Sequence, residues 1–216
     1  MANITTLIFD LDGTLYTSRE LAEEIHRVAV DFLAEQLGQP PDEAAKRLLE
    51  AKRAITLRSG RDATLSSSCL ELGADIRGLH CHLADKVNPE PYLHKDEQVI
   101  AMLKRLGNDY GLYLYTNNNR RLAMRILIAI GIEDCFKKIF TIEELWRSKP
   151  DRIAIEAILA GIGVPASACL FVGDRYDVDL RLPAELGGST FLSSSVDELL
   201  ELESFLLQTK QERITQ

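Results

Sequence analysis

The chain has 216 residues, of which 46% are hydrophobic, so it can bury the core of one domain or of a core domain with a smaller insert. Its 25 basic and 33 acidic residues give a net charge of −8, which disfavours a nucleic-acid partner because nucleic-acid binding requires a basic surface. No apolar run approaches the ~20 residues that span a bilayer, so we also expect no membrane partner.

The first expected element is a buried strand at Thr6–Asp10 (TLIFD), an apolar run that ends in a carboxylate. Residues 17–89 show a different pattern from this first strand: apolar residues recur there at helical spacing, and no segment has the pattern of a strand. Four helices are expected, with apolar stripes at residues 21–33, 44–55, 65–72 and 76–87. Thr17 and Glu20 predict a capping box for the first helix, and prolines end the fourth. We interpret residues 17–89 as an all-helical cap domain.

Strands and helices alternate in residues 90–216. Two apolar runs, LYLY at residues 112–115 and ACLFV at residues 168–172, predict strands, and residues 138–141 and 190–192 are weaker candidates. Helical stripes lie between them, and Ser195 with Glu198 predicts a capped last helix. This alternation predicts an α/β fold with a parallel sheet that has helices on both faces. The expected core is a Rossmann-like domain made of residues 1–16 and 90–216.

The cysteines and the first ten residues both indicate a cytoplasmic protein. The four cysteines form no C-x-x-C pair and lie in expected helices or strands, where a free thiol acts as a small hydrophobe. Residues 1–10 contain no basic stretch before a long apolar run, so we expect no signal peptide. We therefore predict a reduced, cytoplasmic protein that is a monomer or a homodimer.

Reactive side chains follow four of the expected strands, at the end where ligands bind in an open parallel sheet. They are Asp10 and Asp12, then Thr116, then Lys149, then Asp174. Three oxygen-rich positions, at Asp10, Asp12 and Asp174, fit an octahedral Mg²⁺ site that accepts a phosphate oxygen.

These groups together suit the hydrolysis of a phosphate ester. A metal ion, Lys149 and the Thr116 hydroxyl would mask the charge of the phosphate. Asp10 would then attack as a covalent nucleophile, and Asp12 would protonate the leaving alcohol and activate water.

Four motifs resemble those of the haloacid dehalogenase superfamily, in order and over nearly the whole chain. They are F-D-L-D-G-T-L (residues 9–15), Y-T-N (115–117), S-K-P (148–150) and V-G-D-R-Y-D-V-D (172–179). The first motif is specific, and the set is strong together. The family's dehalogenases lack the second aspartate of motif one, so Asp12 favours the phosphatase branch. The helical insert resembles the family's C1 cap, and Tyr16 with the Y-T-N-N-N run is loosely similar to pyrimidine 5′-nucleotidase-like members.

The resemblance implies a role for each matching residue. Asp10 and Asp12 would be catalytic, and the phosphoryl group would be held by Thr116, Asn117 and Lys149. The implied Mg²⁺ ligands are Asp10, the Asp12 carbonyl, Asp174 and Asp179. Spacing leaves open whether Asp177 or Asp179 is the second acid of motif four, and we favour Asp179 because Asp177 could simply cap a helix.

The expected function is therefore Mg²⁺-dependent hydrolysis of a small phosphorylated metabolite, either a nucleoside monophosphate or a sugar phosphate. The alternatives are a phosphomutase of the same family, a non-catalytic binding protein on the same fold, and a haloacid dehalogenase.

Two groups in the insert carry competing interpretations. His80, Cys81 and His82 could bind a metal, but adjacent helical residues point different ways, so an ordinary helix is favoured, and His82 could instead face the active site. The arginines at positions 53, 58 and 61 are interpreted as a solvated loop rather than a specificity loop.

Overall fold

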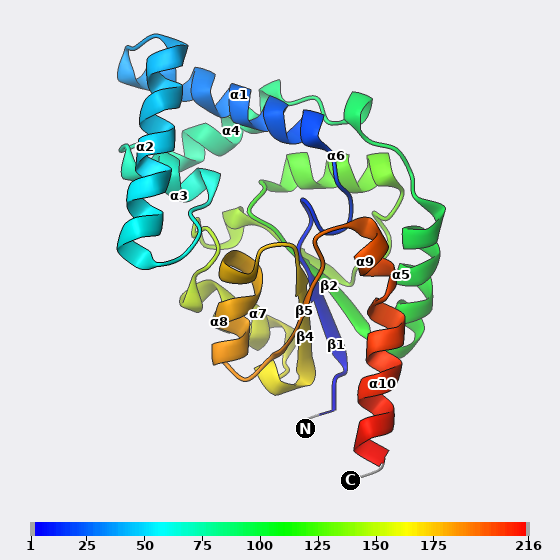
Figure 1. Ribbon diagram of the computed structural model, residues 1–216. Helices are drawn as coiled ribbons and strands as arrows, with labels where there is room; N and C mark the ends of the chain where they lie inside the picture. Colours follow the sequence, from blue (N-terminus) through cyan, green and yellow to red (C-terminus); the bar gives the residue numbers. More distant parts are fainter. Residues whose placement is uncertain (1–2, 215–216) are drawn as a thin grey trace.

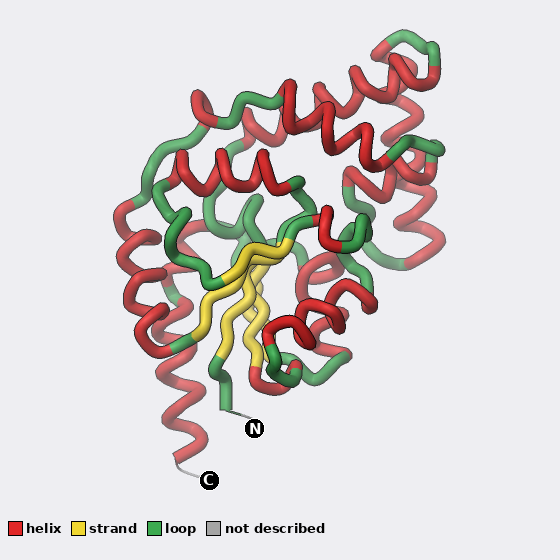
Figure 2. Tube along the Cα trace, turned by 180° about the vertical axis from the view of Figure 1, so that it is seen from behind, coloured by secondary structure: helices red, strands yellow, loops and turns green. Residues whose placement is uncertain are grey.

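The computed structural model describes residues 3–214 and contains one five-stranded parallel sheet in the order β3-β2-β1-β4-β5. The strands are β1 (Thr6–Phe9), β2 (Gly111–Tyr115), β3 (Lys138–Phe140), β4 (Cys169–Gly173) and β5 (Ser189–Leu192). Helices cover both faces of the sheet, as Figures 1 and 2 show from opposite sides. The predicted α/β class and parallel sheet are confirmed.

Alternating side chains of the strands build a separate core on each face of the sheet. In β1, Leu7 and Phe9 pack in one cluster with α5 (Glu97–Asp109), α6 (Arg120–Ile130), α9 (Val196–Leu200) and α10 (Leu202–Ile214). Ile8 points to the opposite face, where it packs with α7 (Arg152–Ile162) and α8 (Arg181–Glu185). The strand is continuously apolar because both of its faces are buried.

Four helices form a layer beyond the carboxyl ends of the strands, and we call this layer the cap (Figure 1). They are α1 (Arg19–Leu37), α2 (Pro41–Ser59), α3 (Leu65–Glu71) and α4 (Ile76–Lys86). The domain boundaries at residues 16/17 and 89/90 stay a prediction. Within residues 3–214, no helix combines the length and the apolar character that crossing a bilayer requires.

The predicted capping box at Thr17 is wrong by one residue. The N-cap of α1 is Ser18, whose Oγ accepts a hydrogen bond from the backbone N–H of Leu21 at 3.2 Å. The backbone at Ser18 is extended, which is the conformation that an N-cap requires.

Candidate active site

The parallel register brings three predicted residues to the same edge of the sheet. Phe9 of β1 lies opposite Leu114 of β2 and Val172 of β4. The residues that follow these strands, among them Asp10, Thr116 and Asp174, therefore meet at one edge. Asp10 is fixed there by a backbone hydrogen bond of 2.8 Å from its N–H to the carbonyl of Val172.

Lys149 reaches this edge from the segment before α7 and is almost completely buried, with 3% of its surface exposed. Its Nζ donates three hydrogen bonds, to Asp10 Oδ1 at 2.5 Å, to Asp179 Oδ1 at 2.7 Å and to the carbonyl of Tyr115 at 2.9 Å. All three ammonium protons are thus used. Burial alone would lower the pKa of Lys149, but the charges of Asp10 and Asp179 outweigh burial and hold that pKa above its usual value.

Three carboxylates form an acidic cluster around this lysine. One oxygen from each of Asp10, Asp174 and Asp179 lies within 4.8 Å of the other two. Burial raises the pKa of Asp10 to about 7, although the Lys149 charge opposes the shift, and burial raises the pKa of Asp174 to about 6. Two buried carboxylates and the partly exposed Asp174, with a single buried ammonium group among them, leave an excess of negative charge.

This cluster fits a divalent cation. The buried Asp174 Oδ1 accepts no hydrogen bond from any residue that the structure describes. Gly13, at φ +86°, lies so close that a Cβ there would be 2.5 Å from Asp174 Oδ2. A glycine is therefore needed at this position, both for the backbone conformation and for the room around the carboxylate. Oxygen ligands with excess negative charge are what Mg²⁺ or Ca²⁺ binds.

The geometry also separates the two acids of motif four that spacing left open. Asp179 is 6% exposed and bonds to Lys149, whereas Asp177 forms an ion pair with Arg181 away from the cluster. The chain forms a π-helix at Tyr176–Leu180, which directs Asp179 inward. The metal-binding role of Asp179 stays a prediction.

Asp12 is held by two donors that sequence reasoning missed. Tyr16 Oη donates to Asp12 Oδ1, and Asn118 Nδ2 donates to Asp12 Oδ2 at 2.7 Å. Burial raises the pKa of Asp12. The sequence feature that could have identified Tyr16 is its position four residues after Asp12. In the structure an isolated β-bridge joins these two residues.

The residues of motif two lie where a phosphate would need donors. Asn117 Oδ1 accepts a hydrogen bond from the backbone N–H of Lys149 at 2.8 Å, while its buried Nδ2 has no partner among residues 3–214. Thr116 is completely buried, and its Oγ1 accepts the backbone N–H of Asn118 at 3.1 Å. The Asn117 amide is therefore free to donate to a ligand.

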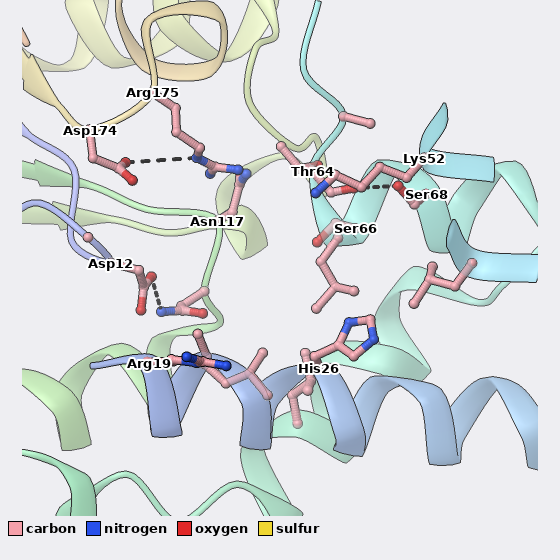
Figure 3. A pocket seen from close by; sticks show the side chains of 18 of the residues that line it. Asp12, Arg19, His26, Lys52, Thr64, Ser66, Ser68, Asn117, Asp174 and Arg175 are labelled. Carbon is pink, nitrogen blue, oxygen red and sulfur yellow. Dashed lines mark hydrogen bonds and ion pairs between the residues drawn. The ribbon is translucent and has the colours of Figure 1, made fainter. Parts of the chain in front are cut away.

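A cavity of about 930 Å³ separates the acidic cluster from the cap (Figure 3). Its core side is formed by Asp12, Asn117, Asp174 and Arg175. On its cap side, α1 and α2 contribute four basic side chains that sequence reasoning missed: Arg19, His26, Lys46 and Lys52.

The structure separates the two histidines of α4. His80 lines the cavity, and its Nε2 is 3.1 Å from Ser66 Oγ. His82 instead packs against Phe32, with ring centroids 5.5 Å apart, and it lines a different groove. The possibility that His82 faces the active site is therefore not realised.

None of the three cap arginines singled out in the sequence lines the cavity. Arg58 forms an ion pair with Glu71, Arg61 forms one with Glu185, and Arg53 is exposed. The interpretation of these arginines as a solvated surface agrees with their positions.

Comparison with known proteins identifies the family of this chain. A family model described as haloacid dehalogenase-like hydrolase matches residues 4–187. The phosphoglycolate phosphatase of Neisseria gonorrhoeae is 30% identical over 190 residues, which cover 82% of this chain and 75% of that protein. The glyceraldehyde 3-phosphate phosphatase of Methanopyrus kandleri is 29% identical over 185 residues, which cover 82% of this chain and 78% of that protein.

The fold agrees with the same family. A crystal structure of a HAD phosphatase from Thermococcus onnurineus matches with a TM-score of 0.60 at 20% identity, covering 94% of this chain and 98% of that one. The family model spans most of the chain and includes the strand ends that carry Asp10, Thr116, Lys149 and Asp174. The chain therefore belongs to the haloacid dehalogenase-like hydrolases.

Proposed function

We propose that the chain is a Mg²⁺-dependent phosphatase that hydrolyses a small phosphomonoester through an aspartyl-phosphate. The observation that carries the proposal is a cluster of three carboxylates at the floor of a cavity: Asp10 and Asp179 bind the ammonium group of Lys149, and Asp174 lies beside them. The two relatives above are named for phosphatase activity on small phosphorylated compounds, which supports the reaction class. Nucleoside monophosphates and sugar phosphates are the substrate classes to test first.

Mg²⁺ would be held by Asp10, Asp174 and the backbone carbonyl of Asp12, with Asp179 beside them. The bound cation would neutralise part of the charge on the phosphate and so allow an anionic nucleophile to approach it. Asp174 Oδ1, which accepts no hydrogen bond from the described residues and has only Arg175 Nε at 3.8 Å, supports this assignment together with the excess of acids.

The residues of the chain divide the work of the reaction. A carboxylate oxygen of Asp10 attacks phosphorus, and the bond between phosphorus and the leaving oxygen breaks. Asp12 donates a proton to that leaving oxygen, for which its raised pKa is favourable. In the second half, Asp12 takes a proton from water, which attacks the phosphorus and releases the Asp10 carboxylate with inorganic phosphate.

The other polar residues position the phosphoryl group. Lys149 lies 2.5 Å from Asp10 Oδ1, so its ammonium group can stabilise charge that shifts between that oxygen and the phosphate. Asn117 Nδ2 and the Thr116 hydroxyl are the neutral donors on the same side.

The test is phosphate release from p-nitrophenyl phosphate with Mg²⁺, with water as the only acceptor. Asp10→Asn is expected to lower kcat by more than about a thousandfold, since removing the nucleophile of a covalent enzyme costs on the order of 10⁴–10⁶. Asp177→Asn is the matched control, because Asp177 belongs to the same motif but pairs with Arg181. Turnover that is unchanged in Asp10→Asn contradicts the mechanism.

The same assay separates the alternatives. A phosphomutase would show little release when water is the only acceptor, and a dehalogenase would release halide without a metal ion. A binding protein would show no turnover in either assay.

A further inference from the structure

The charged side chains that line the cavity differ between its two sides. The core side contributes two carboxylates, Asp12 and Asp174, and one guanidinium, that of Arg175. Every titratable residue that the cap contributes through α1 and α2 is basic, with Lys46 and Lys52 both on α2. Figure 3 places Lys52 across the cavity from Asp12 and Asp174. A protein with a net charge of −8 thus presents a positive wall to this one space.

The two lysines on this wall lack partners of their own. Among the side chains that the structure describes, none forms a hydrogen bond or an ion pair with the ammonium group of Lys46 or Lys52, and both lysines are exposed. Several arginines of the cap are paired; Arg58, for example, binds Glu71 at 2.9 Å. Unpaired ammonium groups that face a cavity are available to an anionic ligand.

Between the two charged ends the wall is largely apolar. Ile25 of α1 and Leu48 of α2 line it, together with Leu49, which is 47% exposed. The volume of about 930 Å³ lies near the upper end of the range of about 300–1,000 Å³ that is typical of small-molecule sites. A phosphate with a leaving group of two or three carbons would leave most of this space to water.

We propose that the leaving group of the substrate has an apolar body with a second anionic group at its far end, and that Lys46 and Lys52 bind that group. The second anion is a carboxylate or another phosphate, because either has the charge and the oxygen acceptors that the lysines require. This inference rests on the proposed function, since it assumes that the scissile phosphate occupies the acidic end with its metal ion.

The test compares two substrates that differ in this anion alone, 4-carboxyphenyl phosphate and phenyl phosphate, in the presence of Mg²⁺. The measured quantity is the preference ratio, which is kcat/KM for the carboxylated ester divided by kcat/KM for phenyl phosphate. The intrinsic difference between the two phenols cancels when this ratio is compared between the wild type and a variant. The phenyl ring supplies the apolar body in both cases.

We expect Lys52→Gln or Lys46→Gln to lower the preference ratio at least about threefold, and the double variant about tenfold, as for partly exposed ion pairs. Lys52→Glu should lower the ratio further, because it places a like charge opposite the carboxylate. Lys86→Gln is the matched control: Lys86 is an exposed cap lysine that does not line the cavity, and it should leave the ratio unchanged. Replacing the carboxylated ester with 1,4-phenylene bisphosphate shows whether a phosphate is preferred as the second anion.

A binding measurement distinguishes a failure of this inference from a failure of the proposed function. In the Asp10→Asn background with Mg²⁺, calorimetry gives the dissociation constants of both esters without turnover. If neither ester is hydrolysed by the wild type but the affinity for the carboxylated ester still depends on Lys46 and Lys52, the proposed function fails, whereas the binding of the second anion by these lysines is supported. If the preference ratio and the affinities are the same in the double variant as in the wild type, the inference is overturned.

Discussion

Acidification from about pH 7.5 to about pH 5 is expected to lower the free energy of unfolding by about 2 kcal/mol through His80 alone. This histidine lies on α4 and is 2% exposed. Its Nε2 bonds to Ser66 Oγ, while its Nδ1 has no partner among the described residues. The Trp146 ring of the core packs beside it, with centroids 6.3 Å apart. A charged imidazolium would therefore be held in a poorly solvated site between the cap and the core.

The sign of this pH effect follows from the different protonation of His80 in the folded and the unfolded chain. Burial lowers the pKa of His80 from 6.5 to about 4, so the folded protein keeps a neutral imidazole while the unfolded chain takes up a proton near pH 6.5. The contribution of neutral His80 to the free energy of unfolding is fully present above pH 6.5 and is lost as the pH falls toward 4. The full shift is 6.5 − 4 = 2.5 units, or about 3.4 kcal/mol at 1.36 kcal/mol per unit, of which about 2 kcal/mol is reached by pH 5.

Urea unfolding followed by far-UV circular dichroism at the two pH values measures this loss. Carboxylates titrate in the same range, so the informative quantity is the difference between the wild type and His80→Gln, whose amide can retain the bond to Ser66. We expect the pH-dependent loss to be about 2 kcal/mol smaller in His80→Gln. His94→Gln, at an exposed histidine, is the matched control. Equal pH dependence in the wild type and His80→Gln would refute the reasoning.

Two further predictions concern the site. Lys149→Met should lower the free energy of unfolding of the metal-free protein by about 3–5 kcal/mol, because two buried carboxylates lose their ammonium partner. Urea unfolding measures this loss, and a loss below about 1 kcal/mol would contradict the ion-pair geometry. Tyr16→Phe removes one of the two donors to Asp12, so kcat should fall about tenfold more for an alkyl phosphate, which needs a proton on its leaving group, than for p-nitrophenyl phosphate. Equal losses on the two esters would mean that Tyr16 does not position the acid.

Sequence patterns predicted the sheet because its central strands are buried on both faces. All of β1 and β4 is buried, so both strands appear as unbroken apolar runs. The edge strands β3 and β5 gave weaker signals since most of their residues are partly exposed. The start of α1 was placed one residue early because Thr17 and Ser18 are both hydroxyl residues, and only the backbone conformation decides which of them caps the helix.

The core side of the site was predictable from sequence, whereas the cap side was not. Residues that follow parallel strands must meet at one edge of the sheet, so their convergence follows from the strand assignments alone. Lys52 and Arg53 are neighbours on α2 and point about 100° apart, so one of them can line the cavity while the other does not. Which of the two does so depends on how the helix is oriented over the core, and one helix's sequence does not contain that information.

The opposite charges at the two ends of the cavity bear on which end of a doubly anionic substrate reacts. At the core end, the four carboxylates of Asp10, Asp12, Asp174 and Asp179 outnumber the two cations, Lys149 and Arg175, so this end repels an anion unless a divalent cation is bound. At the cap end, Lys46 and Lys52 attract an anion whether or not the metal ion is present. A phosphomonoester without a second charge should therefore depend on the cation for nearly all of its affinity, whereas a doubly anionic one should keep part of its affinity without it. The cation, rather than the lysines, then selects the end at which a phosphate meets Asp10.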